Sequence, residues 1–230
     1  MKNALSLILV LLLLLSLFGC DTSNKEDSEA DPTAAVSTEA PTQIVPPTTV
    51  PEDQSDISQK VTKGVLAGDV YSSSFTGLEF TKPGDWTFAT DEELAGIYGF
   101  AVEDLSEENF SRTLDETASV YDMQAFSPDG ILNINIGYEN TKITNGAPIT
   151  ADEYIDVFTD AYINLMGAEA LEEKSVTLSG YEYLRCSYKL ESMEPVMYQH
   201  CYCRSIGDYV NFVVCTSDSD SPEEFEAMFS

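Results

Sequence analysis

The composition of the chain changes abruptly near residue 60, and this change limits which part of the sequence can fold. Residues 21–60 contain no aromatic residue, and Thr, Ser, Pro, Asp and Glu dominate them. Five prolines in this stretch would interrupt a helix. Such a segment buries too little apolar surface to offset its ordering entropy, so we expect residues 20–60 to be a disordered spacer. Residues 61–230 suit a single globular domain with its own core.

The first twenty residues are typical of an export signal. Lys2 supplies a positive charge, and residues 4–18 are apolar apart from two serines. This run is shorter than the roughly 20 residues that a membrane span needs. It ends in Leu17-Phe18-Gly19-Cys20, which resembles the lipobox of bacterial lipoproteins, although Phe18 is larger than the residue usual there. The resemblance implies cleavage after a signal peptide of residues 1–19 and lipidation of Cys20. An ordinary signal peptide with an incidental cysteine, or an uncleaved helix, is the alternative.

A lipid on Cys20 would decide where the domain works. Two or more acyl chains give stable anchoring, so we expect the membrane to be one partner, contacted through this lipid. The domain is then extracytoplasmic, on the outer face of the cytoplasmic membrane. A coil of about 40 residues would span roughly 35 Å between the lipid and the domain.

The net charge argues against several classes of partner. The chain has 40 Asp and Glu residues against 11 Lys and Arg, which gives a formal charge of −29. Nucleic acids, anionic lipids and wall polyanions would be repelled by such a surface. A soluble acidic exterior explains the charge without a specific role, and a dedicated cation-binding function is the alternative. We expect no nucleic-acid partner and a monomer.

Local patterns predict strands joined by tight turns, with helices between them. Strands are expected at 70–75, 78–81, 86–88, 120–126, 131–138, 175–178, 181–190, 196–206 and 209–215. In the strand 131–138, three aliphatic residues alternate with Asn133 and Asn135. Helices are expected after Thr90, at 106–114, after Thr150 and after Ser221, and the last two begin with capping signatures. This order predicts an α+β fold, with an antiparallel sheet of about six or seven strands flanked by helices.

Three short motifs resemble known proteins. The run Gly77-Leu78-Glu79-Phe80-Thr81-Lys82-Pro83-Gly84-Asp85-Trp86 is similar to the N-terminal signature of PsbP-like domains. Residues 120–123 and 135–140 are similar to uncharacterised lipoproteins of Gram-positive anaerobic bacteria. The resemblance implies a PsbP-like α/β/α sandwich over most of 70–230. It implies scaffolding and partner-binding roles and brings no shared catalytic set.

Metal and nucleophile chemistry find little support in the sequence. The single histidine, His200, cannot form a His-rich site, and no serine stands out as its nucleophile; we expect a half-exposed strand residue. In a regular strand Cys201 and Cys203 share one face while His200 points to the other, which argues against a zinc site. The acidic groups Asp91-Glu92-Glu93 and Asp218-x-Asp220 are explained by helix capping and solvation. We therefore expect no metal, no cofactor and no catalytic residue.

Four cysteines remain after Cys20, namely Cys186, Cys201, Cys203 and Cys215. An even number in an exported chain permits disulfides. A hairpin of 181–190 with 196–206 would bring Cys186 close to Cys201 and Cys203, and a bond to either is within reach. Cys201 and Cys203 are an unfavourable pair, at about 6.5–7 Å between Cα atoms of one strand. Buried reduced thiols are the alternative.

Three functions remain open. We expect a non-enzymatic protein-interaction module that binds a protein or envelope partner. The first alternative is a small-ligand binding protein for a transporter or sensor. Its pocket would be lined by tyrosines of the predicted strands, namely Tyr181, Tyr183, Tyr188, Tyr198 and Tyr202. The second alternative is a carboxylate-based hydrolase of wall glycans, for which no acidic pair stands at a recognisable position.

Overall fold

The computed structural model of the chain describes residues 60–230. The predicted signal peptide, the lipidation site Cys20 and the spacer lie outside the described residues, apart from Lys60. Val61, the second described residue, is already buried in the core.

Seven antiparallel strands form the main sheet of the described residues, which confirms the predicted α+β class. The hairpins β5–β6 and β8–β9 are those that the turn signals predict, and β7 starts earlier than predicted. In spatial order the strands are β4 (Thr87–Phe88), β5 (Ser119–Phe126), β6 (Asn133–Asn140), β10 (Tyr209–Ser217), β9 (Met197–Ile206), β8 (Tyr181–Leu190) and β7 (Glu169–Leu178).

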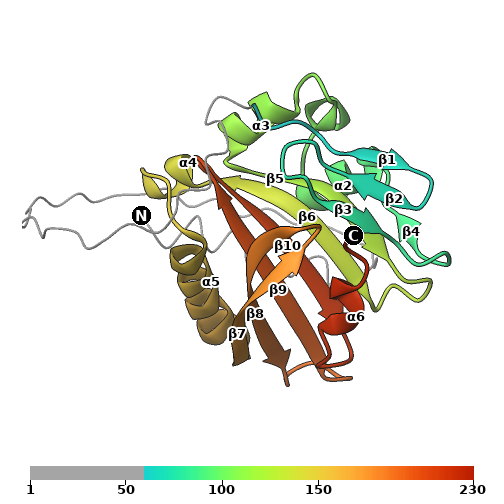
Figure 1. The fold of residues 1–230 in the computed structure, drawn as a ribbon, viewed down its shortest axis with the longest axis vertical. Coiled ribbons are helices and arrows are strands. Elements are labelled where there is room, and N and C mark those ends of the chain that lie inside the picture. Colours follow the sequence, from blue (N-terminus) through green and yellow to red (C-terminus); the bar gives the residue numbers. More distant parts are fainter. Residues whose placement is uncertain (1–59) are drawn as a thin grey trace, which may run out of the picture.

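Helices cover one face of this sheet. Figure 1 shows α5 (Ala151–Met166) beside the β7–β9 end. The α2 helix (Asp91–Tyr98) covers the other end, because Tyr98 stacks on Tyr121 of β5 at 3.7 Å between ring centroids. Both helices begin with a capping box, at Thr90 and at Thr150, and the second of these boxes was predicted from the sequence.

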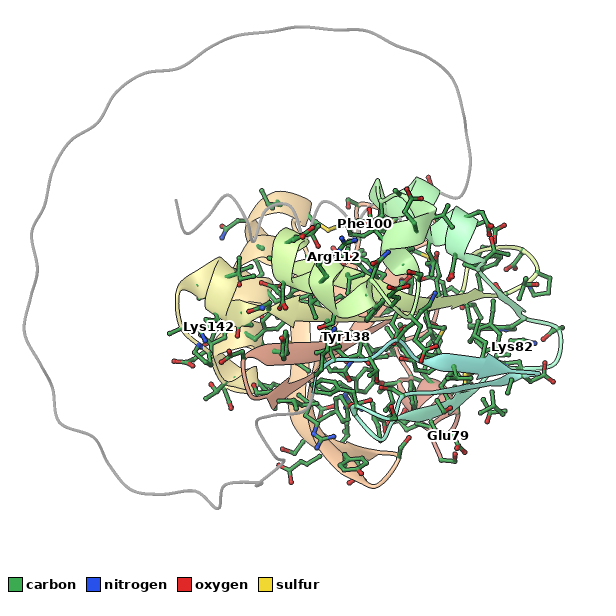
Figure 2. The ribbon with its side chains drawn as sticks, turned by 90° about the horizontal axis from the view of Figure 1, so that it is seen from above. Glu79, Lys82, Phe100, Arg112, Tyr138 and Lys142 are labelled. Carbon is green, nitrogen blue, oxygen red and sulfur yellow. The ribbon has the colours of Figure 1, made fainter. Side chains whose placement is uncertain are left out.

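The opposite face carries a second, smaller sheet. Its strands are β1 (Val65–Ala67), β2 (Val70–Ser72) and β3 (Glu79–Thr81). Tyr71 and Phe80 are its inward residues and are fully buried. Figure 2 shows Glu79 and Lys82 on this side, away from the helices near Phe100 and Arg112. The predicted sheet of about six or seven strands is the main sheet, and the sequence did not indicate that these three short strands form a second one.

Two predicted helices differ in the structure. The helix expected at 106–114 is α3 (Phe110–Thr117), and η1 (Val102–Leu105) precedes it. Ser106 ends η1, because its hydroxyl donates to the Glu103 carbonyl. The last helix, α6 (Glu223–Glu226), is one turn long, and Pro222 is its N-cap. The expected Ser221 cap is absent from it, so that capping prediction was wrong. A further short helix, α4 (Thr141–Asn145), follows β6.

The alternation predicted for β6 is confirmed, although both of its faces are buried. Ile134 and Ile136 pack with Phe80 in the core under the small sheet. Asn135 points to the helical face, where its Oδ1 accepts a hydrogen bond of 3.3 Å from Tyr98 Oη. A buried polar side chain is tolerated there because it is hydrogen-bonded.

Candidate functional site

The single histidine is part of a buried polar cluster under α6, which we call the His200 cluster (Arg185, Ser187, His200, Tyr202 and Glu226). His200 is fully buried, so the expectation of a half-exposed residue was wrong. The reason is that α6 covers this part of the sheet, with the Phe225 ring 6.2 Å from the imidazole.

A serine lies beside the histidine, which the sequence did not indicate. A hydrogen bond of 2.9 Å joins Ser187 Oγ on β8 to His200 Nδ1 on β9, because the sheet register sets these residues opposite each other. Burial lowers the pKa of His200, so the ring is neutral at pH 7. A serine hydrogen-bonded to a neutral imidazole is the pair of groups that a nucleophile–base arrangement uses. Both residues are buried, which suits a structural contact and not attack on a substrate.

In the His200 cluster, Arg185 contacts two carboxylates that are nearer the surface. Its guanidinium lies 2.6 Å from Glu226 of α6 and 2.6 Å from Glu172 of β7. Burial alone would lower the pKa of Arg185, but the hydrogen bond and charge of Glu226 raise it above its usual value. Removing one partner of a buried ion pair is destabilising, so we expect the contact with Glu226 to help to hold α6 on the sheet.

The Ser187→Ala substitution is expected to lower the free energy of unfolding by about 1 kcal/mol, because it leaves a buried ring nitrogen without its partner. Urea unfolding at pH 7 measures this value. The exposed Ser192→Ala variant is the control and should unfold like the unaltered chain. Equal stabilities of the two variants would show that the contact contributes nothing.

A second polar cluster joins the small sheet to the main one, and we call it the Asp122 cluster (Gly64, Tyr71, Ser73, Asp122 and Tyr138). Asp122 lies at a register irregularity of β5. Its carboxylate accepts from Gly64 N at 2.9 and 3.0 Å and from Tyr71 Oη at 2.6 Å. A Cβ on Gly64 would lie 2.2 Å from the Tyr71 ring, so only glycine allows this approach. Burial raises the pKa of Asp122 to about 6, although both donors lower it in part.

Ser73 and Tyr138 form a second contact between the small sheet and the main sheet. A hydrogen bond of 3.0 Å joins Ser73 Oγ to Tyr138 Oη of β6. Lys63, which precedes Gly64, lies 2.5 Å from Asp91 at the start of α2. The segment that begins the domain is therefore held to both faces of the sheet. These side-chain hydrogen bonds of the Asp122 cluster are made among its own members, and they join the small sheet to the main sheet.

The four cysteines of the described chain are buried and free. The register sets Cys186 opposite Cys201, while Cys203 lies opposite Leu184 and Cys215 opposite His200. Cys186, Cys201 and Cys203 face α5, and Cys215 faces the small sheet, because neighbouring residues of a strand alternate. The predicted separation of His200 from Cys201 and Cys203 is thus confirmed. Among residues 60–230, no three His, Cys, Asp or Glu side chains gather as a metal site.

The tyrosines proposed to line a pocket do not share one face. Tyr188 is buried against α5, with its ring 4.7 Å from that of Tyr162. Tyr183 and Tyr202 are buried on the other face, in the core under the small sheet. Tyr181 is exposed, and the Arg204 guanidinium covers its ring at 4.2 Å. A single pocket walled by all these rings is therefore inconsistent with the structure.

The helical side exposes aliphatic side chains within an acidic surface. Ile97 at the end of α2 is 37% exposed, and Val102 at the start of η1 is 40% exposed. Phe100 between them is half-buried, and Figure 2 shows it on the helical side of the molecule. Within 91–117 the chain has nine acidic residues and one basic residue, Arg112. We call residues 96–103, together with the acidic residues of 91–117, the apolar–acidic surface. No helix in the described part of the chain is long and apolar enough to cross a membrane.

Two solved structures are similar to this chain. The solution structure of cyanobacterial PsbP (CyanoP) from Synechocystis sp. PCC 6803 is 11% identical, with a TM-score of 0.41, over 77% of this chain and 92% of that one. A crystal structure from Bacteroides thetaiotaomicron VPI-5482 is 12% identical, with a TM-score of 0.40, over 71% of this chain. This chain matches 47%, about half, of that protein's length. Both similarities concern the fold alone.

Comparison by sequence adds nothing further. No protein-family model and no curated protein matches the chain.

Proposed function

We propose that the chain is a membrane-tethered, non-enzymatic module that binds a basic protein through its apolar–acidic surface. The observation that carries the proposal is the exposure of Ile97 and Val102 among carboxylates on the helical side. An apolar centre inside a polar rim is the common anatomy of a protein interface. Single exposed aliphatic residues are ordinary on a protein surface. Ile97 and Val102 differ because they lie close together in the chain, at the end of α2 and the start of the adjoining η1.

Charge defines the chemistry of the partner. The acidic residues near this surface include Glu92, Glu103 and Glu107, all of which are exposed. A partner with lysines or arginines around an apolar side chain would complement both parts of the surface. Complementary charge speeds the encounter, and buried apolar contacts supply most of the affinity. Binding should therefore weaken as salt is added, without disappearing.

The interior supports a binding role over an enzymatic one. Several groups that could act as acid, base or nucleophile lie in the interior, among them Asp122, His200 and Ser187. Asp122 and His200 are hydrogen-bonded to neighbouring side chains and buried with them. The lipid on Cys20 and the spacer, which the sequence predicts, would keep the domain near the outer membrane surface and within reach of a partner there.

We expect amphipathic peptides with alternating Lys and Leu to bind the full chain at micromolar concentration. Ile97→Asp with Val102→Asp should weaken this binding at least about tenfold, because the apolar centre is lost while the negative charge increases. The measurement is fluorescence anisotropy of the labelled peptide, with the full chain in nanodiscs of neutral lipid.

The matched control is Val157→Asp with Ile163→Asp on α5. These residues are 43% and 45% exposed and also have acidic neighbours, so the change in charge is the same. They differ from Ile97 and Val102 because six residues of one helix rotate them about 240° around its axis from each other, so that they do not form one patch. The control should bind the peptide as the unaltered chain does. Equal affinities of the two double variants would show that the peptide binds only by general charge attraction. A complete lack of peptide binding by the unaltered chain would contradict the proposal.

A further inference from the structure

Two of the four buried cysteines lie directly opposite each other in the main sheet, which is the pairing that a cross-strand disulfide requires. Cys186 of β8 and Cys201 of β9 are direct partners in an antiparallel pair. Residues opposite each other in such a pair have Cα atoms about 4.5 or 5.5 Å apart. Both values lie within the usual 4.4–6.8 Å range of disulfides. The two side chains also point to the same face of the sheet, since opposite residues share a face.

The other two cysteines do not meet these conditions. Cys203 lies opposite Leu184, so it is a diagonal neighbour of Cys186, roughly 7–8 Å away and beyond the usual disulfide range. Cys215 is opposite His200 on the adjacent strand and therefore faces away from Cys186 and Cys201. The register thus separates one suitable pair from two thiols that have no suitable partner among the described residues.

The surroundings of the pair are those of a protected site. The α5 helix covers it, and Thr159 of that helix lies 3.9 Å from Cys186 Sγ and 2.7 Å from Tyr188 Oη. Cys201 is deeper than Cys186, at 1% against 4% exposure. A bond formed here would be covered by α5, so external thiols would reach it slowly.

We propose that Cys186 and Cys201 form the one intramolecular disulfide of this domain, with Cys203 and Cys215 remaining thiols. The oxidant is a disulfide of the glutathione type. The Cys186 thiolate attacks one sulfur of that disulfide and displaces a thiolate, leaving a mixed disulfide on Cys186. The Cys201 thiolate then attacks the Cys186 sulfur and displaces the second thiolate. Two protein thiols are oxidised, one disulfide is reduced to two thiols, and the two protons pass to the displaced thiolates.

The order and speed of these steps follow from burial. Burial raises the pKa of Cys186 and raises that of Cys201 well above its usual value. Only the thiolate attacks, so the exchange begins at the less buried Cys186 and is slow in the folded domain. It should be faster during folding, before α5 packs over the pair.

The test uses the full chain with Cys20→Ser, so that four thiols are present. The chain is refolded from denaturant in a mixture of oxidised and reduced glutathione. We expect the intact mass to fall by about 2 Da, because two hydrogen atoms are lost for each disulfide formed. Two thiols should remain reactive in denaturant. The melting temperature should be roughly 6–10 °C higher than that of the reduced chain.

Two variants show whether Cys201 or Cys203 is bonded to Cys186. Arg185, Lys189 and Arg204 place Cys186 in one tryptic peptide and both Cys201 and Cys203 in another, so digestion alone leaves the partner open. In Cys203→Ser the linked peptides should persist, and in Cys201→Ser they should vanish together with the rise in melting temperature. Slow oxidation of the already folded chain should yield the same product. Four reactive thiols after both treatments, a bond that persists in Cys201→Ser, or linked dimers would overturn the proposal.

Discussion

The Gly137→Ala substitution is expected to lower the free energy of unfolding by about 3 kcal/mol. Gly137 lies in the middle of β6, and a Cβ there would stand 2.6 Å from the carbonyl oxygen of Val120 and 2.5 Å from Cζ of Phe212. Phe212 is buried, and the carbonyl belongs to the neighbouring strand. Neither can move away cheaply, and overpacking of this kind costs about 1–3 kcal/mol or more.

Urea unfolding of the full chain measures this loss, and Gly96→Ala is the matched control. Gly96 lies in α2, is exposed, and has no atom within 4 Å of an added Cβ. Alanine at a helical position is better than glycine by roughly 0.5–1 kcal/mol, so the control should be slightly stabilised. If both variants unfolded at the same urea concentration, the close approach of β5, β6 and β10 at Gly137 would be refuted.

The Asp122→Ala substitution is expected to be the second large change, with a loss of about 3 kcal/mol at pH 5. It leaves the buried Tyr71 hydroxyl and the partly buried Gly64 amide without an acceptor, and an unsatisfied buried group costs about 1–3 kcal/mol. The small sheet should loosen first, so amide exchange at Tyr71 should accelerate more than at Phe212. The exposed Asp85→Ala variant serves as the control and should unfold like the unaltered chain.

The same carboxyl group should make stability depend on pH. Burial raises the pKa of Asp122 to about 6, above the value of about 3.9 expected in the unfolded chain. Folding therefore favours the protonated form. The stability that this proton contributes is fully present below about pH 4 and is lost as the pH rises through about 6. The expected size of the loss is on the order of 2–3 kcal/mol.

Asp122→Asn isolates this effect, because the amide keeps an acceptor oxygen and does not ionise. The difference in unfolding free energy between the unaltered chain and this variant should change between pH 4 and pH 7, in favour of the variant at the higher pH. A difference that stays constant over this range would mean that Asp122 has an ordinary pKa.

Local signals explain most of what the sequence predicted correctly. The Thr150 capping box acts within four residues, and the turn of residues 127–130 joins two strands that are neighbours in the chain. Such features depend on short-range hydrogen bonds and on backbone preferences, so the residues that produce them lie next to one another in the sequence. The strand alternation that separates His200 from Cys201 and Cys203 is local in the same sense.

The candidate clusters depend on contacts between distant parts of the chain. Asp122 receives its donors from Gly64 and Tyr71, 58 and 51 residues away. Arg185 meets Glu226 across 41 residues. A pattern in one strand carries no information about which distant segment covers it. This is why His200 was expected to be half-exposed, and why its partner Ser187 was not identified.

The sequence by itself therefore determined the α+β class, the main hairpins and the second capping box, because each depends on neighbouring residues. It also placed the domain after residue 60 and predicted the lipid on Cys20, both of which remain predictions. Only the tertiary structure decided that β1–β3 form a separate layer and that Cys201, rather than Cys203, lies opposite Cys186. The register of a sheet and the packing of its faces are set by the sum of many distant contacts, and a shift of one residue would reverse every side chain of a strand.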